Sequence, residues 1–182
     1  MLDLAKLESG HAEWQAAQID LNEIVADAVG ATSQLFKSRG VALEVRAAAK
    51  VARVLADRDR VMQVMLNLLS NAVKFCPDGT GRVEVRLSEG GGNVRIDVQD
   101  NGVGISPEHQ RIIFEKFRQV GDTLTDKPAG TGLGLAICRQ IIDHFGGRLS
   151  VESESGRGAV FSFTLPAIAA SASVPRLAAG AF

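Results

Sequence analysis

The feature that most constrains the fold is an apolar stretch from Asp57 to Phe75, which reads ADRDRVMQVMLNLLSNAVKF with the alanine before it. Asp57 is a typical residue to cap the start of a helix. Apolar side chains cover nearly every side of the helix that follows: Val61, Met62, Val64, Met65, Leu66, Leu68, Leu69, Ala72, Val73 and Phe75. The sequence therefore predicts a long, buried helix.

One narrow line of polar residues interrupts this apolar surface. Gln63, Asn67, Asn71 and Lys74 follow one another at steps of four, four and three, which places them along a single helix face. Polar groups on a buried face cost free energy unless they have partners. Two interpretations remain open at this point: a seam that faces water, or a face that contacts a polar ligand such as a metal ion with phosphates.

Length and composition indicate one globular domain with short appendages. The chain has 182 residues, of which 46% are hydrophobic, and its net charge of -1 provides no basic field for nucleic acid. Cys76 and Cys138 lie outside any metal-binding or redox spacing, so we interpret them as buried thiols in a reducing compartment. The charged start is not a signal peptide, and no run is long enough to span a membrane. We expect a cytoplasmic protein that binds no nucleic acid, although a longer parent could be anchored in a membrane.

The rest of the chain alternates between strand and helix patterns. Strands are expected at about 13–19, 41–46, 53–56, 82–87, 94–99, 149–151 and 159–165, and helices at about 20–38, 57–75, 110–117 and 135–145. The stretch 118–130 has no period, and a loop of that length in a compact domain is usually functional.

Two short segments contain residues that suit a nucleotide, although each is weak evidence by itself. The segment Gly130–Gly134 comes directly before a predicted helix, where bare backbone and free N–H groups suit phosphate. A glycine hinge without a ligand explains it equally well. Asp100 ends a strand just before Gly102 and Gly104, so its carboxylate could accept a hydrogen bond from an exocyclic amine such as that of adenine. A simple turn aspartate is the commoner explanation.

The order of four segments is much more specific than any one of them. They are NLLSNAVK at 67–74, DNGVGI at 100–105, FEKF at 114–117 and GTGLGL at 130–135. This succession resembles the catalytic, ATP-binding domain of two-component sensor histidine kinases, members of the Bergerat-fold ATPases. The segments look like that family's N box, first glycine box, F box and second glycine box, and the resemblance covers about 13–165.

The resemblance implies an α/β fold: a two-layer sandwich in which helices back a mixed sheet, with a mobile ATP lid at about 105–129. It implies ATP and Mg²⁺ as cofactors. Asn71 would bind Mg²⁺, with Asn67 beside it as a second ligand or supporting partner, and Lys74 would reach phosphate. Asn67 and Lys74 would be the catalytic residues.

The remaining ATP contacts also follow from the resemblance. Asp100 would accept the adenine amine, and Gly102 and Gly104 would lie under the base. Other contacts are expected from Ile105, Phe117, Gly130, Thr131, Gly132, Leu133, Gly134 and Leu135, with Arg118 as a looser candidate for phosphate. Phe114 and Phe117 would anchor the lid.

The first residues look like the end of an amphipathic helix, stopped by Ser9 and Gly10. The resemblance implies that 1–12 closes a dimerisation and phosphoacceptor domain and that 13–166 is the catalytic domain. Residues 167–182 are rich in alanine and serine and have no period, so we expect a disordered tail. The phosphoacceptor histidine of that family lies further upstream. His11, His109 and His144 lack its context, so we interpret them as surface or packing residues.

The chain is therefore expected to transfer the γ-phosphoryl group of ATP to a histidine on a domain that this sequence lacks, and not to phosphorylate itself. The implied partners are that dimerisation domain and the receiver domain of a response regulator. The full-length parent would be a homodimer and this fragment a monomer.

Two competing functions remain open. The ATP-hydrolysing branch of the same fold resembles this chain but has a glutamate one helical turn before the Mg²⁺-binding asparagine, where it activates water. That position is Asn67 here, so negligible hydrolysis is expected. A regulatory, nucleotide-sensing module, as in degenerate kinases, is the non-enzymatic alternative.

Overall fold

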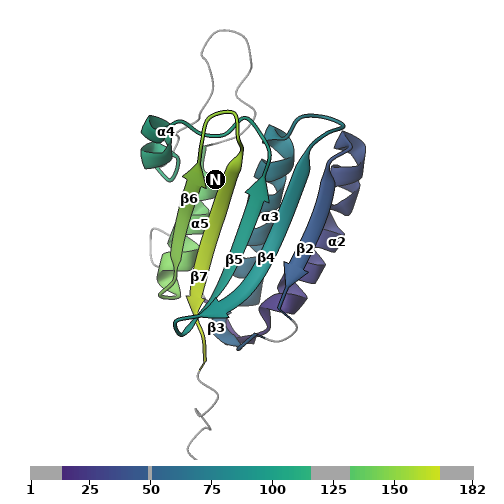
Figure 1. Ribbon diagram of the computed structural model, residues 1–182. Helices are drawn as coiled ribbons and strands as arrows, with labels where there is room; N and C mark the ends of the chain where they lie inside the picture. The colour runs from purple at the N-terminus through teal and green to yellow at the C-terminus, as the bar shows by residue number, and fades with distance from the viewer. Residues whose placement is uncertain (1–13, 49–50, 116–131, 169–182) are drawn as a thin grey trace, which may run out of the picture.

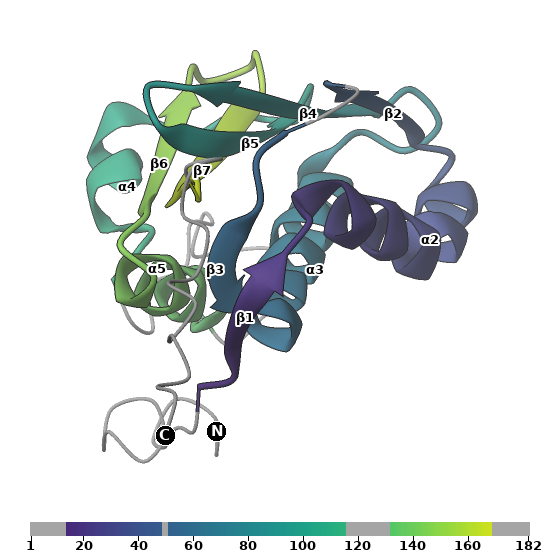
Figure 2. The same ribbon diagram turned by 90° about the horizontal axis from the view of Figure 1, so that it is seen from below.

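The computed structural model describes residues 14–48, 51–115 and 132–168. A five-stranded sheet in the order β2-β4-β5-β7-β6 forms one layer, and α2, α3 and α5 cover one of its faces (Figures 1 and 2). The elements are β1 (Ala16–Ile19), α2 (Leu21–Arg39), β2 (Ala42–Ala47), β3 (Val54–Asp57), α3 (Arg58–Phe75), β4 (Arg82–Gly90), β5 (Asn93–Asp100), α4 (Pro107–Ile112), α5 (Gly134–His144), β6 (Arg148–Ser153) and β7 (Ala159–Pro166). The predicted two-layer α/β sandwich is confirmed.

The sheet is mixed, as predicted. β2 pairs with β4 in parallel, whereas β4, β5, β7 and β6 pair antiparallel. Gly91 and Gly92 form the two-residue hairpin turn between β4 and β5, and both have positive φ. β1 and β3 form a separate antiparallel pair beside the helices (Figure 2).

Helix α3 begins as the sequence predicts. The Asp57 carboxylate caps it by accepting hydrogen bonds from the N–H groups of Asp59 (3.0 Å) and Arg60 (3.2 Å). Seven of its side chains are buried: Val61, Val64, Met65, Leu68, Leu69, Ala72 and Val73. The expectation that apolar residues are buried on nearly every side is wrong at the end of the helix, because Phe75 is 42% exposed. α3 therefore has a buried face against the sheet and an open face at its C-terminal end.

Helix α2 also begins and ends where expected. Asp20 accepts a hydrogen bond from Asn22 N–H at 2.8 Å, and Gly40 closes the helix in the left-handed conformation with φ 61°. Glu23 suggests a reciprocal capping box, but within the described residues it makes no hydrogen bond to Asp20. The cap is therefore one-sided.

Two predictions about burial and helix position need correction. The alternation of apolar and polar residues along 41–46 predicts that Val45 faces the core, but Val45 is 41% exposed because β2 is an edge strand with a neighbour on one side only. The short helix expected at 110–117 is instead α4, Pro107–Ile112. Ser106 caps it and Pro107 occupies its first turn, so the helix begins at the cap and ends before Phe114.

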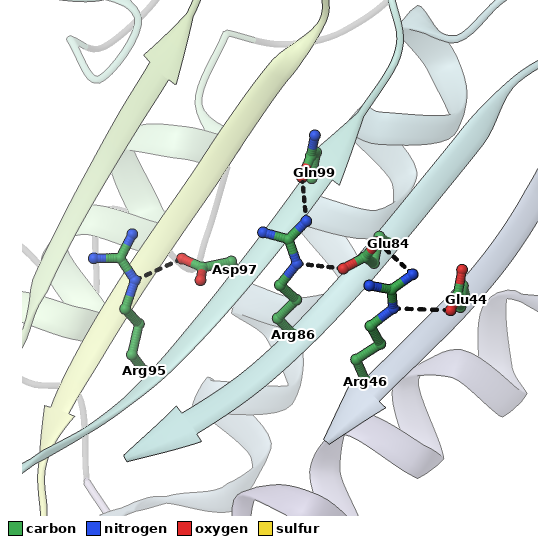
Figure 3. Close-up of polar contacts among 7 residues, drawn as sticks. All are labelled: Glu44, Arg46, Glu84, Arg86, Arg95, Asp97 and Gln99. Atoms are coloured by element: carbon green, nitrogen blue, oxygen red, sulfur yellow. Dashed lines mark hydrogen bonds and ion pairs between the residues drawn. The ribbon is translucent and has the colours of Figure 1, made fainter. Parts of the chain in front are cut away.

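The sheet face opposite the helices is covered by a charged network, drawn in Figure 3. Arg46 pairs with Glu44 (2.9 Å) and Glu84 (3.6 Å), and Arg86 also pairs with Glu84. Arg95 pairs with Asp97 at 2.7 Å. Exposed pairs of this kind contribute little to stability each. Three of these four pairs lie within one strand and Arg46–Glu84 joins β2 to β4, so the charges on this outer face are paired with one another.

Several predictions fall on the edges of the described chain. The predicted segments 1–12 and 167–182 lie largely outside the described residues, as do Phe117, Arg118, Gly130 and Thr131 and most of the proposed lid. Beyond β7, Ala167 N–H donates to Gly92 O (2.9 Å) and Ile168 N–H to Arg53 O (2.7 Å). Ala167 and Ile168 therefore still contact the folded domain.

The two histidines in the described chain have local partners. His109 Nδ1 lies 3.0 Å from Ser106 Oγ in the cap of α4. His144 stacks on the Trp14 ring with centroids 3.8 Å apart, and both rings meet Phe145 edge-on. This agrees with their interpretation as surface or packing residues.

Candidate functional site

The middle of α3 lies against the first turn of α5. The Asn67 side chain donates a hydrogen bond from Nδ2 to Cys138 Sγ at 3.5 Å. A Cβ placed on Gly134 would lie 3.7 Å from the amide carbon and oxygen of Asn67, which is ordinary contact. Asn67, on the polar line of α3, therefore lies next to Gly134 of the second glycine segment. Gly134 comes 67 residues after Asn67 and 63 residues after Asn71 in the chain.

The four residues of the polar line differ in burial and in their hydrogen-bond partners. Gln63, Asn67 and Asn71 are half-buried, and Lys74 is exposed with its Nζ 4.8 Å from the Phe75 ring centroid. Gln63 accepts a hydrogen bond from Arg60 at 3.2 Å, which makes it a local contact at the start of the helix. The Asn71 side chain makes no hydrogen bond to any residue that the structure describes. Asn67 is therefore the member of the line that contacts Gly134, and Asn71 and Lys74 follow it along the helix toward Phe75, whose carbonyl borders Gly102.

Asp100 is a buried carboxylate at the end of β5, with 7% exposure. Its Oδ1 accepts hydrogen bonds from Gly102 N–H (2.8 Å) and Ala159 N–H (3.3 Å). Within the described residues its Oδ2 accepts none. Burial raises the pKa of Asp100, and the two N–H groups oppose that rise. One carboxylate oxygen is thus fixed by the fold, and the other remains available to a hydrogen-bond donor.

The glycines after Asp100 are required by close backbone contacts. A Cβ on Gly102 would lie 2.5 Å from the Phe75 carbonyl oxygen, at the end of α3. Gly104 has φ +70°, and a Cβ there would collide with the Glu154 carbonyl group in the turn between β6 and β7. The loop is therefore pressed between α3 and that turn, which the sequence reasoning did not foresee when it assigned both glycines to a base.

The start of α5 offers backbone groups. Gly132 has φ 68°, Gly134 is the first helical residue, and no side chain caps the helix. Leu133 is buried and Leu135 is half-buried against the core, so their side chains serve packing. Only the backbone N–H groups here are placed for an anion, which such a helix start favours.

The donor set excludes some metals and suits others. The described residues contain no cluster of three or more histidine, cysteine, aspartate or glutamate side chains that could hold a metal ion. Amide oxygens from Asn67 and Asn71 suit a hard cation that keeps several other oxygen ligands, as Mg²⁺ does with phosphates. Neutral amide ligands beside a helix start therefore suit a metal ion that binds together with its anionic ligand, as Mg²⁺ does with phosphates.

Sequence reasoning missed several contacts around the site. Cys138 lies four residues after Gly134, so helical spacing could have placed it on the same face. Gln110 and Ser153 hydrogen-bond to the loop after β5, as described below, and nothing in the local sequence indicated that.

Comparison with known proteins agrees with this arrangement. Residues 56–169 match the family described as histidine kinase-, DNA gyrase B- and HSP90-like ATPases. The sensor histidine kinase ZraS of Klebsiella oxytoca is 37% identical over 164 residues, which cover 90% of this chain and 34% of that protein. The chain spans less than half the length of such curated relatives, 43% of SasA and 20% of LuxQ.

Solved structures give the same result. Full-length ShkA in complex with AMPPNP superposes with a TM-score of 0.78 at 32% identity, covering 91% of this chain and 34% of that one. The catalytic domain of histidine kinase ThkA, in a nucleotide-free form, gives 0.73 at 29% identity and covers 84% of this chain and 98% of the domain.

Fold and site together define an ATPase-type catalytic domain, and the chain belongs to the histidine kinase-, DNA gyrase B- and HSP90-like ATPase family. Its relatives and structural neighbours place it with the catalytic domains of sensor histidine kinases. No helix in the described part of the chain is long and apolar enough to cross a membrane.

Proposed function

We propose that the chain binds Mg-ATP and transfers its γ-phosphoryl group to a histidine on a dimerisation domain outside this sequence. The observation that carries the proposal is the convergence of three features on α3. Asn67 touches the uncapped start of α5, and the end of α3 touches Gly102. Asp100 next to it has one carboxylate oxygen that accepts no hydrogen bond from the described part of the chain. A nucleotide needs the same three features: a place for phosphates, a place for a metal, and an acceptor for an amine.

Each residue has a role that its chemistry supports. Asn71 and Asn67 would hold Mg²⁺ through their amide oxygens, and Lys74 would neutralise phosphate charge. Asp100 Oδ2 would accept the adenine amine, while Gly132 and Gly134 would bring N–H groups close to the phosphates. Bound Mg²⁺ would supply charge neutralisation during transfer, and the protein residues would supply position.

The roles of the remaining site residues stay predictions from the resemblance. Phe117, Gly130 and Thr131 would complete the ATP contacts, Phe114 and Phe117 would anchor a lid, and Leu133, Ile105 and Leu135 would contribute backbone around the nucleotide. ShkA, a structural neighbour, was solved with the ATP analogue AMPPNP, which supports ATP as the ligand.

Transfer to a protein is favoured over hydrolysis by the identity of Asn67. An amide has no basic lone pair with which to take a proton from water, so the isolated chain should hydrolyse ATP at a negligible rate. Steady multiple turnover without an acceptor domain would contradict this.

The partners and location follow from the same proposal. The acceptor would be the two-helix dimerisation domain of the same kinase, and the phosphoryl group would then pass to a response regulator receiver domain. The full-length parent would be a cytoplasmic or membrane-anchored homodimer with this domain in the cytoplasm, whereas the fragment would be a monomer. The net charge of -1 favours no nucleic-acid partner.

The test combines binding with transfer. The purified chain is incubated with labelled ATP, Mg²⁺ and a separate two-helix domain that contains the acceptor histidine, and acid-labile phosphohistidine is measured. Asp100→Asn should reduce both ATP affinity and transfer, whereas Asp97→Asn, the same change on the solvated face of β5, should leave both near wild type. ATP binding without any transfer would contradict the kinase assignment, and no binding at millimolar Mg-ATP would favour a degenerate regulatory module.

A further inference from the structure

Both backbone groups of Ile105 are held by side chains from other elements. Its N–H donates to Ser153 Oγ on β6 at 2.8 Å, and its carbonyl accepts from Gln110 Nε2 on α4 at 2.8 Å. The same Gln110 nitrogen donates to the Ser153 carbonyl at 2.8 Å, and Ser153 Oγ donates to Gly158 O at 2.6 Å. Ile105, Gln110 and Ser153 thus form a closed hydrogen-bond network that ends in the turn between β6 and β7.

That turn also contacts the rest of the loop after β5. Gly156 N–H donates to Val103 O at 2.7 Å, and Ala159 N–H donates to Asp100 Oδ1 at 3.3 Å. A Cβ on Gly158 would collide with the Asp100 carbonyl oxygen, and one on Gly104 would collide with Glu154. Figure 1 shows α4 beside β6, at the end of the sheet where this turn lies. The loop 100–105 therefore packs against the β6–β7 turn, whose residues come about 50 positions later in the chain.

Such a loop would otherwise be free to move. Gly102 and Gly104 restrict the backbone less than any other residue would, so holding one conformation costs entropy. Each neutral hydrogen bond contributes only about 1 kcal/mol net, but two converge here on the backbone of one residue, Ile105. A loop that is already ordered before a ligand arrives avoids that ordering cost on binding.

We propose that Gln110 and Ser153 are positioning residues that preorganise the loop 100–105 and thereby set selectivity for adenine over other bases. The inference rests on the proposed function, because this loop contains Asp100, the acceptor assigned to the adenine amine. Neither side chain touches the nucleotide in this proposal. They act through Ile105 and through the turn that fixes Asp100 Oδ1.

The experiment measures binding of Mg-ATP and Mg-GTP to the full chain by calorimetry. Gln110→Ala and Ser153→Ala should each weaken ATP binding roughly 5- to 10-fold, about the value of one lost hydrogen bond. GTP, which lacks the amine at that position, should be affected less, so the preference for ATP over GTP should fall. Ser153→Thr keeps the hydroxyl group and should retain the wild-type preference.

Matched controls separate this role from general destabilisation. Ser150→Ala lies on the same strand but on the solvated face, and Arg111→Ala is the exposed neighbour of Gln110, so both should bind ATP and GTP as wild type does. Hydrogen exchange at the Ile105 amide gives a readout in the folded protein and should become faster in Ser153→Ala. An unchanged ATP-to-GTP preference in folded Gln110→Ala and Ser153→Ala would overturn the inference, whereas a wild-type chain that does not bind ATP would overturn the proposed function itself.

Discussion

Asn67 on α3 donates its amide hydrogen to the thiol of Cys138 on α5, with Nδ2 and Sγ 3.5 Å apart. Cys138 is fully buried, so this bond is shielded from water. Because Nδ2 is directed to the sulfur, the amide oxygen of Asn67 is left for the face that Gly134 borders. The contact joins the helix with the polar line to the helix that begins at the glycine segment.

Replacing Cys138 should therefore affect nucleotide binding. Cys138→Val keeps a similar volume but removes the acceptor, so the Asn67 amide loses its fixed orientation, and Mg-ATP affinity should fall roughly 2- to 10-fold. Cys138→Ser keeps an acceptor and should bind more tightly than the valine variant. Calorimetric titration at fixed Mg²⁺ measures both. Equal affinity of the valine variant and the wild type would show that the thiol does not orient Asn67.

The thiols should resist alkylation in the folded protein. Burial raises the pKa of Cys138 to about 12, and burial also raises the pKa of Cys76. The thiolate is the reactive form, so both residues should react with iodoacetamide far more slowly at pH 8 than they do in urea. Mass spectrometry counts the labels over time. Rapid labelling of Cys138 in the native chain would mean that α3 and α5 separate readily.

The pH dependence of stability should reveal the buried Asp100. Its pKa is raised above the ordinary value of 3.8, so the folded state holds this proton more tightly than the unfolded state does. The resulting stabilisation is fully present below about 3.8 and is lost as the pH rises through the folded-state pKa. Asp100→Asn cannot titrate, so its stability relative to wild type should improve over that same rise in pH.

Urea unfolding at a series of pH values from below 3.8 to 7 measures this difference. Asp97→Asn provides the control, since Asp97 lies in the solvated network on the outer face and pairs with Arg95. A difference between Asp100→Asn and wild type that stays constant with pH would contradict the raised pKa. The same Asp100 variant should lose nucleotide affinity, which separates its stability from its function.

Much of this architecture could be predicted from local sequence. Steps of four, four and three placed Asn67, Asn71 and Lys74 on one helix face, and Asp57 and Gly40 marked helix ends that the structure confirms. Local rules failed where distant elements decide the outcome. The exposure of Val45 depends on β2 being at the sheet edge, which periodicity along one strand does not reveal.

The candidate site shows the same division. The residues that we propose to face a nucleotide come from four short segments in order. The side chains that hold the loop around Ile105 could not be predicted, because Ser153 and Gln110 reach Ile105 only after β6 and α4 have packed together. Glycine patterns were ambiguous for the same reason: Gly102 and Gly104 suit a ligand, yet each already has a protein backbone beside it.

Two glycines with the same backbone conformation should respond very differently to alanine. Gly104 has φ +70° and Gly92 has φ +75°, so an alanine at either position adopts a left-handed conformation that costs roughly 1 to 2 kcal/mol. At Gly92 the new methyl group meets nothing within 4 Å, whereas at Gly104 it collides with the Glu154 backbone. Gly104→Ala should therefore lose clearly more stability than Gly92→Ala, because the loop must move away from the β6–β7 turn. Thermal unfolding of both variants measures the difference, and similar losses would mean that the loop does not rest on that turn.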